Sequence, residues 1–195
     1  MNGLLLIGGL SRRMGRDKSQ MHYHHKSQLV YLYEILSQIC DQVFVSGRKN
    51  QKEEIPSEYL FLADGPTSRG PLEGIYQLFQ TEPQLPGLVL ACDLPLLQVD
   101  CLKELIQHRD PSCLATVFQN PTTELPEPLI GIWEPRAKWI IEASLNQGQL
   151  SPRQILKEHP IKMISPTNPD CLKNVNTPEE SSEVFKIIQS KKKTI

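Results

Sequence analysis

The sequence lacks any long hydrophobic run, which excludes a chain that crosses a membrane as a helix. No stretch of its 195 residues approaches the ~20 consecutive apolar residues that a transmembrane helix needs. The apolar stretch near the N-terminus is too short, and carries too little charge in front of it, for a secretion signal. We therefore expect a cytoplasmic protein with no membrane partner.

The sequence also lacks cysteine pairs at the spacings used for metal binding or redox chemistry. Five cysteines lie far apart and form no C-x-x-C motif: Cys40, Cys92, Cys101, Cys113 and Cys171. This spacing argues against a zinc cage and a disulfide framework, so we expect buried free thiols. The cluster His22-Tyr23-His24-His25 predicts a polar hairpin or turn rather than a metal site, because adjacent side chains point apart.

No excess of one charge marks the chain. Its 21 Lys and Arg residues balance 22 Asp and Glu residues, for a net charge of −1. The basic residues are scattered except in one loop near the N-terminus and at residues 191–193, so no footprint for duplex nucleic acid is present. No internal repeat or linker divides the chain. We expect one domain over residues 1–190, followed by a basic tail over 191–195.

The most informative segment covers residues 3–19, GLLLIGGLSRRMGRDKS. A short apolar run, typical of a strand buried on both faces, stops at the pair Gly8-Gly9, where the backbone can turn and approach a ligand closely. Exposed backbone N–H groups and side-chain cations both bind anionic oxygens. The loop brings four such cations within seven residues: Arg12, Arg13, Arg16 and Lys18. The segment therefore predicts a triphosphate-binding loop.

The standard glycine fingerprints do not fit this loop. A Walker loop needs glycine directly before its lysine, but Asp17 precedes Lys18, and no G-x-G-x-x-G is present. The segment closely resembles the L-A-G-G-x-S-x-R-M-G-x-D-K signature of molybdenum cofactor guanylyltransferases. The positions that match are Gly8, Gly9, Ser11, Arg13, Met14, Gly15, Asp17 and Lys18. The one departure in the core of the motif is Ile7, where the family usually has alanine.

Beyond the loop, apolar runs with the pattern of strands alternate with runs at helical spacing. We expect strands over 4–7, 43–45, 59–62, 87–91, 114–117 and 129–133. We expect helices over 29–39, 72–79, 102–108, 136–145, 153–158 and 178–188. The proline-rich residues 120–128 predict a loop insertion. The alternation predicts an open α/β sheet, and the resemblance implies a three-layer, Rossmann-like nucleotidyltransferase fold with a mostly parallel central sheet.

In open α/β sheets, ligands bind beyond the carboxyl ends of the strands. Asp93 follows the expected strand 87–91, so its carboxylate can hold Mg²⁺ against substrate phosphates. The alternative is that Asp93 only caps a turn fixed by Pro95. Its surroundings are similar to the family's C-D-x-P motif, which favours the metal role.

Two further segments resemble the same family. Residues 174–178 resemble its N-V-N-T-P element, which lies near the metal in related nucleotidyltransferases, and this implies Asn176 as a second ligand to Mg²⁺. The alternative is an ordinary helix cap. Residues 127–129 are similar to the family's E-P-L strand start, on the pterin side of the cleft, and we assign no role to individual residues there.

The resemblance also implies how guanine is read. Asp64 precedes a G-P-L-x-G element at residues 70–74, and its carboxylate would accept hydrogen bonds from guanine N1–H and the exocyclic amine. The alternative is a simple Asp-Gly turn. Ser46 aligns where the family often has asparagine. The GTP-binding residues implied are Ile7, Gly8, Gly9, Ser11, Gly15, Lys18, Ser46, Asp64 and Asp93.

The reaction implied is transfer of GMP from GTP to the terminal phosphate of molybdopterin, with release of pyrophosphate. Both substrates are anions, so their negative charge must be neutralised during the reaction. We expect Lys18, Arg13 and Mg²⁺ on Asp93 to supply the positive charge. A phosphate acceptor is already ionised, so neither a protein nucleophile nor a general base is required. Molybdoenzymes or cofactor chaperones are the protein partners that the resemblance suggests.

Three alternatives stay open from the sequence. A molybdopterin cytidylyltransferase usually has A-A-G in place of Ile7-Gly8-Gly9 and lacks the pair Asp17-Lys18, which favours guanine. A sugar-phosphate nucleotidyltransferase would use the same loop and metal, but such chains are often longer. A non-catalytic nucleotide-binding protein that delivers cofactor is the third alternative, and the presence of Lys18 and Asp93 argues against it.

Overall fold

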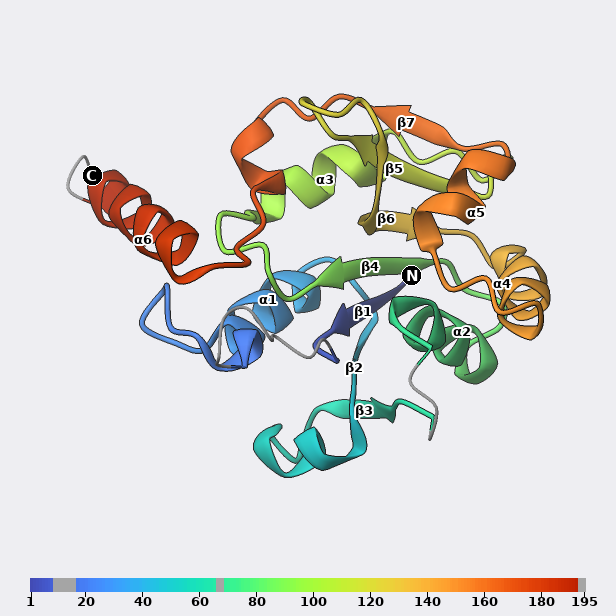
Figure 1. The fold of residues 1–195 in the computed structure, drawn as a ribbon, viewed down its shortest axis with the longest axis horizontal. Helices are drawn as coiled ribbons and strands as arrows, with labels where there is room; N and C mark the ends of the chain where they lie inside the picture. Colours follow the sequence, from blue (N-terminus) through green and yellow to red (C-terminus); the bar gives the residue numbers. More distant parts are fainter. Residues whose placement is uncertain (9–16, 66–68, 193–195) are drawn as a thin grey trace.

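The fold is a seven-stranded sheet covered by helices on both faces, here seen in a computed structural model that describes residues 1–8, 17–65 and 69–192. In the sheet the strands take the order β3-β2-β1-β4-β6-β5-β7 (Figure 1). Their bounds are β1 Asn2–Leu6, β2 Gln42–Gly47, β3 Leu60–Ala63, β4 Gly87–Ala91, β5 Ala115–Gln119, β6 Pro126–Trp133 and β7 Lys162–Ile164.

The sheet is mostly parallel, as the sequence predicts. β1 pairs in parallel with β2 and β4, and β2 pairs in parallel with β3. β6 runs antiparallel to both of its neighbours, β4 and β5, and β7 pairs in parallel with β5 at the edge. The carboxyl ends of the first four strands therefore lie at one edge of the sheet, which is where open α/β sheets bind ligands.

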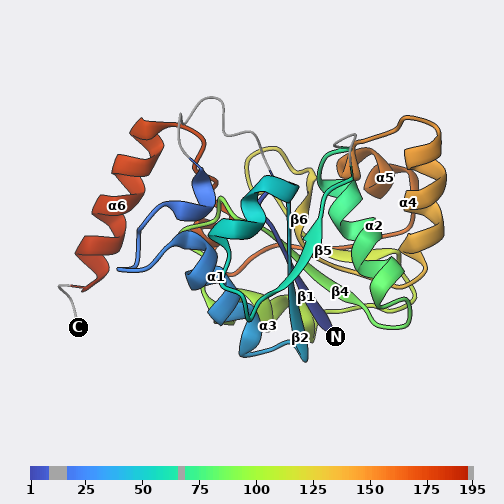
Figure 2. The ribbon, with the colours of Figure 1, turned by 90° about the horizontal axis from the view of Figure 1, so that it is seen from below.

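Helices form a layer on each face of this sheet. The α-helices are α1 Gln28–Ser37, α2 Pro71–Thr81, α3 Val99–Gln107, α4 Ala137–Asn146, α5 Pro152–Glu158 and α6 Pro178–Lys192, and the 3-10 helices are η1 Lys18–Gln20, η2 Lys49–Glu54 and η3 Pro169–Leu172. Figure 2 shows α1 and α3 on one face and α2, α4 and α5 on the other.

The alternation of side chains along β1 explains both layers. Leu5 packs in one hydrophobic core with Leu32 of α1 and Leu102 of α3. Leu4 packs in the other with Ile75 of α2 and Ile141 of α4. Successive strand residues point to opposite faces, so a continuous apolar run fills both cores. The predicted three-layer α/β architecture is confirmed.

The C-terminal helix α6 lies apart from both layers (Figures 1 and 2). It packs through a third apolar cluster that includes Tyr23, Leu96 and Val184. The Tyr23 hydroxyl also donates a hydrogen bond to Ser181 of α6 at 3.0 Å. His22 and Ser27 form a short antiparallel bridge, which agrees with the predicted turn over the histidine cluster.

The two helix starts that the sequence marks are capped as expected. The Ser151 hydroxyl accepts from the backbone N–H of Gln154 at 3.3 Å, with proline at the start of α5. The Thr177 hydroxyl accepts from the backbone N–H of Glu180 at 3.3 Å, at the start of α6. Side-chain caps of this kind satisfy N–H groups that the helix itself leaves unpaired.

Most boundaries differ from the prediction by a few residues, and three differences have a clear physical reason or consequence. β6 begins at Pro126 rather than at residue 129, so the last residues of the expected loop insertion, 126–128, are strand. Proline is tolerated there because β6 pairs with β4 only over residues 130–133, and because β6 carries extra residues where its register against β5 shifts between Val117 and Phe118. β7 was not predicted, since three residues at a sheet edge carry too little pattern. α6 extends to Lys192, beyond the expected end near residue 188.

All five cysteines are free: Cys92, Cys101 and Cys171 are buried as predicted, whereas Cys40 and Cys113 are half-buried. In the part of the chain that the structure describes, no helix is both long and apolar enough to cross a bilayer.

An ion pair with a buried carboxylate joins the end of α3 to the end of β6. Nε and Nη2 of Arg109 donate to the two carboxylate oxygens of Glu134 at 2.7 and 2.8 Å. The Glu134 side chain is only 4% exposed. A paired charge in this position stabilises the fold only while both partners are present, because an unpaired buried charge is costly.

We predict that Arg109→Ala lowers the free energy of unfolding by about 3 kcal/mol, since it leaves the buried Glu134 carboxylate without its partner. Chemical denaturation of both single variants and of the double variant Arg109→Ala/Glu134→Ala tests this. The double variant should lose less stability than the sum of the single losses, and simple additivity would contradict the coupling.

Candidate active site

The edge formed by the carboxyl ends of β1 to β4 gathers most of the predicted site residues. Pairing continues past the strand ends: Ile7 N–H donates to the Ser46 carbonyl at 2.8 Å, and Cys92 N–H donates to the Leu6 carbonyl at 3.1 Å. Asp64 N–H donates to the Gly47 carbonyl at 2.7 Å. These backbone bonds fix the first residues after each strand, so their side chains lie at one edge in a defined order.

Three predicted residues from distant parts of the chain meet at this edge. The Lys18 ammonium donates to Asp93 Oδ2 at 3.2 Å and to Asn176 Oδ1 at 2.6 Å. The side chains of Lys18 and Asp93 are 16% and 20% exposed, so the contact is partly shielded from water. Val175 N–H donates to the Asp93 carbonyl at 2.9 Å, which ties the last predicted segment to β4.

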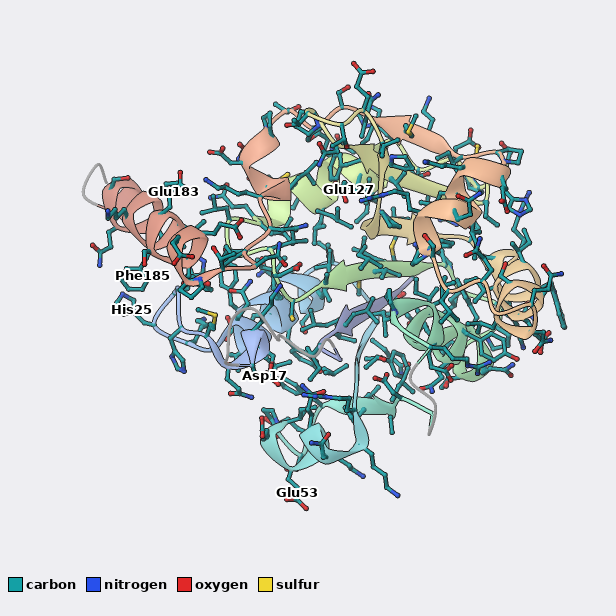
Figure 3. The ribbon with its side chains drawn as sticks, viewed as in Figure 1. Asp17, His25, Glu53, Glu127, Glu183 and Phe185 are labelled. Carbon is teal, nitrogen blue, oxygen red and sulfur yellow. The ribbon has the colours of Figure 1, made fainter. Side chains whose placement is uncertain are left out.

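Local structure explains how Lys18 reaches this point. Asp17 caps η1: its Oδ1 accepts from the backbone N–H of Ser19 at 2.9 Å and from the Ser19 hydroxyl at 2.7 Å. Lys18 is the first residue of η1, so the cap sets the direction of its side chain. Figure 3 labels Asp17 at the blue segment that contains η1.

Asn176 is oriented by the start of α6. Oε2 of Glu180 accepts from the backbone N–H groups of Asn176 and Thr177, at 2.6 and 3.2 Å. The Thr177 hydroxyl, and not the Asn176 amide, accepts from the N–H of Glu180. Thr177 therefore caps the helix, and the Asn176 side chain bonds Lys18. The role of Asn176 as a ligand to Mg²⁺ stays a prediction.

The oxygens of Asp93 and Asn176 suit a hard cation. Both approach one ammonium nitrogen, so they converge on a point where a positive charge is held. Mg²⁺ is usually bound by one or two protein oxygens together with substrate phosphates and water, and this pair fits that pattern. Across the described residues, no group of three or more His, Cys, Asp and Glu side chains could hold a metal. A metal here would depend on oxygens from substrate and water.

Asp64 and Ser46 form a second polar group at the same edge. The Ser46 hydroxyl donates to Asp64 Oδ1 at 3.3 Å. A side chain at Gly8 would place its Cβ 2.7 Å from Asp64 Oδ2, so only glycine allows this close approach. Burial raises the pKa of Asp64; the hydrogen bond from Ser46 opposes this, Glu73 adds to it, and Arg48 lowers it. A carboxylate perturbed in this way is typical of a recognition site.

A pocket lies beside Asp93 on the β6 side. It is lined by Asp93, Leu94, Glu127, Pro128, Arg153 and Asn174, among others. Oε1 of Glu127 accepts from the Asn120 amide at 2.6 Å, and Oε2 lies 3.4 Å from Arg153 Nη2. In the view of Figure 3, Glu127 and Asp17 lie on opposite sides of β4. Asp93 therefore borders both the contact with Lys18 and this pocket.

Sequence reasoning missed several polar residues of this edge. Glu73, in the first turn of α2, is 4% exposed and pairs with Arg69 Nε at 2.5 Å. Arg153 lines the pocket, and Gln51 is 3% exposed next to Asp17. The only signal for Glu73 is an acid at the variable position of the G-P-L-x-G element, and Gln51 and Arg153 stand in none of the motifs described above.

Four predicted GTP-binding or catalytic residues fall outside the described residues, which omit 9–16: Gly9, Ser11, Arg13 and Gly15. Their roles stay predictions. The described ones, Ile7, Gly8, Lys18, Ser46, Asp64, Asp93 and Asn176, are placed by the structure at the edge formed by the ends of β1 to β4 and the start of α6.

Comparison with known proteins gives consistent relatives. A "Molybdenum cofactor biosynthesis bifunctional protein" from Synechocystis sp. is 34% identical over 93% of this chain, which spans only 53% of that protein's length. A "Probable molybdenum cofactor guanylyltransferase" from Flavobacterium johnsoniae is 27% identical, covering 92% of this chain and 94% of the relative.

Solved structures show the same fold. A molybdopterin-guanine dinucleotide biosynthesis protein A from Archaeoglobus fulgidus superposes with a TM-score of 0.82 at 21% identity, covering 97% of this chain and 100% of that one. A 2-C-methyl-D-erythritol 4-phosphate cytidylyltransferase from Thermus thermophilus superposes with a TM-score of 0.68 at 12% identity, covering 95% and 98%. At these identities the likeness establishes the nucleotidyltransferase fold and nothing finer.

The family model described as "MobA-like NTP transferase domain" matches residues 3–163, which include the loop after β1, Asp64, Asp93 and the pocket-lining Arg153. Since this match covers well over half of the chain and agrees with the fold and the edge just described, the chain belongs to the family of MobA-like NTP transferase domains.

Proposed function

We propose that this protein is a Mg²⁺-dependent guanylyltransferase that transfers GMP from GTP to the terminal phosphate of molybdopterin and releases pyrophosphate. The observation that carries the proposal is the meeting of Lys18, Asp93 and Asn176 at the same sheet edge as Asp64. The names of relatives that match nearly the whole chain, such as the one from Flavobacterium johnsoniae, support the same activity.

Charge neutralisation is the main physical demand of this reaction, because an anionic acceptor attacks an anionic triphosphate. Lys18 supplies one cation, and its ammonium can donate hydrogen bonds to phosphate oxygens. Asp93 and Asn176 are the residues that would hold Mg²⁺, which supplies positive charge to the bridging and leaving oxygens. Arg13, by resemblance, would add a phosphate contact or brace the loop.

Among the described residues, the thiol next to Asp93 offers no covalent route that competes with direct attack. Cys92 adjoins Asp93, but burial and the charge of Asp93 raise the pKa of its thiol, so it stays protonated. A phosphate acceptor is ionised at neutral pH and needs no base. The protein therefore works by holding the two substrates in line and by electrostatic stabilisation.

Asp64 would select the base. Guanine presents two N–H donors along one edge, N1–H and the exocyclic amine, and a carboxylate accepts both; adenine lacks the first. Ser46 holds Asp64 Oδ1, and the absence of a side chain at Gly8 leaves room at Oδ2. Bidentate acceptance of this kind gives strong discrimination, because the wrong base leaves a partly buried carboxylate without its donors.

The pocket on the β6 side of Asp93 would take the acceptor. It combines the carboxylate of Glu127 with the guanidinium of Arg153 and opens beside Asp93. Both substrates would then reach Asp93 from opposite sides, which is the arrangement that attack at the α-phosphorus requires.

Pyrophosphate release from GTP, CTP and ATP with Mg²⁺, each with and without molybdopterin, tests this function. We expect release only with GTP plus acceptor. A preference for CTP would point to a cytidylyltransferase, and no release with any nucleotide would contradict a nucleotidyltransferase acting on this acceptor.

We predict that Asp93→Asn lowers kcat for pyrophosphate release by about a hundredfold, because a charged oxygen ligand is lost where charge develops. Thermal unfolding should show an intact fold, since the side chain is isosteric. Asp100→Asn is the matched control, because Asp100 is an exposed aspartate of α3, and it should leave kcat unchanged. Equal activity of Asp93→Asn and the wild type would remove Asp93 from the site.

A second prediction concerns the base. Inosine triphosphate lacks the exocyclic amine of guanine, so the wild-type protein should prefer GTP to it by about tenfold in kcat/KM, roughly the effect of one hydrogen bond to a charged group. In Asp64→Asn this preference should disappear while kcat/KM for GTP falls. A variant that still preferred GTP would show that another group reads the amine.

The same carboxylate predicts a pH dependence. Burial raises the pKa of Asp64, so in the absence of nucleotide it becomes protonated at a higher pH than an ordinary aspartate. A protonated Asp64 accepts fewer hydrogen bonds, so kcat/KM for GTP should fall as the pH is lowered into that range. Asp64→Asn should not show this fall, and an identical acid limb in both proteins would assign it to another group.

A further inference from the structure

Gln51 of η2 is a buried polar side chain that touches both ends of the nucleotide loop. Its Nε2 donates to the Ile7 carbonyl at 3.3 Å and to Asp17 Oδ2 at 2.6 Å. Its Oε1 accepts from the backbone N–H of Arg48 at 2.9 Å and from Arg48 Nε at 3.3 Å. The residue is only 3% exposed.

These four hydrogen bonds match the capacity of the amide, which has two N–H donors and two acceptor positions. Burying an amide is costly unless its groups are paired, so the position is specific for this side chain. The neighbouring backbone is shaped around it: a Cβ at Gly47 would lie 3.0 Å from Gln51 Oε1 and 2.7 Å from Ile7 Cγ1.

The two oxygens that Nε2 contacts belong to residues on either side of the loop that follows β1. Ile7 comes directly before the pair Gly8-Gly9, and Asp17 comes directly before Lys18. One amide group thus fixes the distance between the beginning and the end of this segment. Arg48 Nη2 lies 3.8 Å from Asp17 Oδ2 and adds an attractive charge at the same end.

The position of Asp17 in turn sets the position of Lys18. Oδ1 of Asp17 caps η1 while its Oδ2 is held by Gln51, so the two oxygens of one carboxylate link Gln51 to the first turn of η1. From that turn the Lys18 ammonium reaches Asp93 and Asn176. A continuous set of contacts therefore runs from Gln51 to the site of phosphate chemistry.

We propose that Gln51 is a positioning residue for nucleotide transfer, which holds both ends of the nucleotide loop and thereby sets the place of Lys18. This rests on the proposed function only in that the loop must bind a nucleoside triphosphate. Gln51 itself touches no reacting atom; it acts through Asp17 and through the backbone of Ile7.

Two substitutions separate positioning from packing. Gln51→Glu keeps the shape of the side chain and its acceptance from Arg48, but it sets a carboxylate against the Asp17 carboxylate and the Ile7 carbonyl. Gln51→Leu keeps a similar volume and makes none of the hydrogen bonds. Among the described residues, the charged groups in contact with the amide are Asp17 and Arg48, and arginine keeps its charge at all pH values used.

In Gln51→Glu the contact with Asp17 depends on a proton. With both carboxylates ionised they repel each other, and the loop end is released. As the pH falls the pair takes up one proton, because neighbouring carboxylates cannot easily both ionise, and an O–H then donates to Asp17 as the amide did. The variant should therefore recover in acid, whereas Gln51→Leu cannot.

The experiment measures KM and kcat for GTP at about pH 8 and about pH 6. Each value is divided by that of the wild-type protein at the same pH, so that the pH dependence caused by Asp64 cancels. At the higher pH we expect the KM of both variants to be about tenfold above wild type, the effect of roughly one strong hydrogen bond. At the lower pH the ratio for Gln51→Glu should approach one, while that for Gln51→Leu stays high.

Gln84→Glu, which adds the same charge at an exposed loop position, should match the wild type at both pH values. Thermal unfolding of each variant shows whether it is folded under assay conditions. A KM ratio for Gln51→Glu that is near one at pH 8, or that is raised equally at both pH values, would overturn the proposal.

These results remain distinct from a failure of the proposed function. If the wild-type protein used CTP instead of GTP, the guanylyltransferase assignment would fail, and the same ratios measured with CTP would still test Gln51. If no nucleotide were turned over, equilibrium binding of GTP would supply the comparison, with the dissociation constant in place of KM.

Discussion

The ammonium of Lys18, shared between Asp93 and Asn176, is the interaction on which the rest of the site depends. It joins the loop after β1, the end of β4 and the segment before α6, three parts of the chain separated by up to 158 residues. Each of them is set by its own local structure: a capped 3-10 turn, a buried strand and a helix start. The shared ammonium brings these three segments to one point, where the negative charge of phosphate oxygens must be neutralised.

Around that point the fold positions polar and charged side chains and keeps room for their close approach to the backbone. The strand ends supply backbone pairing that fixes the edge, and glycine at Gly8 and Gly74 allows Asp64 and Ser46 to approach the neighbouring backbone. Burial raises the pKa of Asp64, and Arg48 partly offsets this effect. Parallel strands buried on both faces place these groups on a rigid frame, and rigidity is what a reaction that depends on alignment requires.

Much of this could be predicted from the sequence, and the reasons are physical. Continuous apolar runs such as 87–91 mark buried parallel strands, and Ser151 or Thr177 before proline marks a helix start. Asp93 and Asp64 follow such strands, so their place at one edge follows from topology. Gln51 could not be found in this way, because its importance lies in contacts between segments that no spacing reveals. β7 and the early start of β6 could not be predicted, because a short edge strand and a proline-containing bulge both depend on tertiary pairing.

The proposed site can be tested by a crystal structure of the protein with Mn²⁺ and a GTP analogue that has a methylene group between the α- and β-phosphorus atoms. We predict an anomalous scattering peak from manganese bound to oxygens of Asp93 and Asn176, with the Lys18 ammonium donating to the triphosphate and Asp64 facing the guanine edge. Manganese bound away from both residues, or an analogue seated elsewhere than at the ends of β1 to β4, would contradict it.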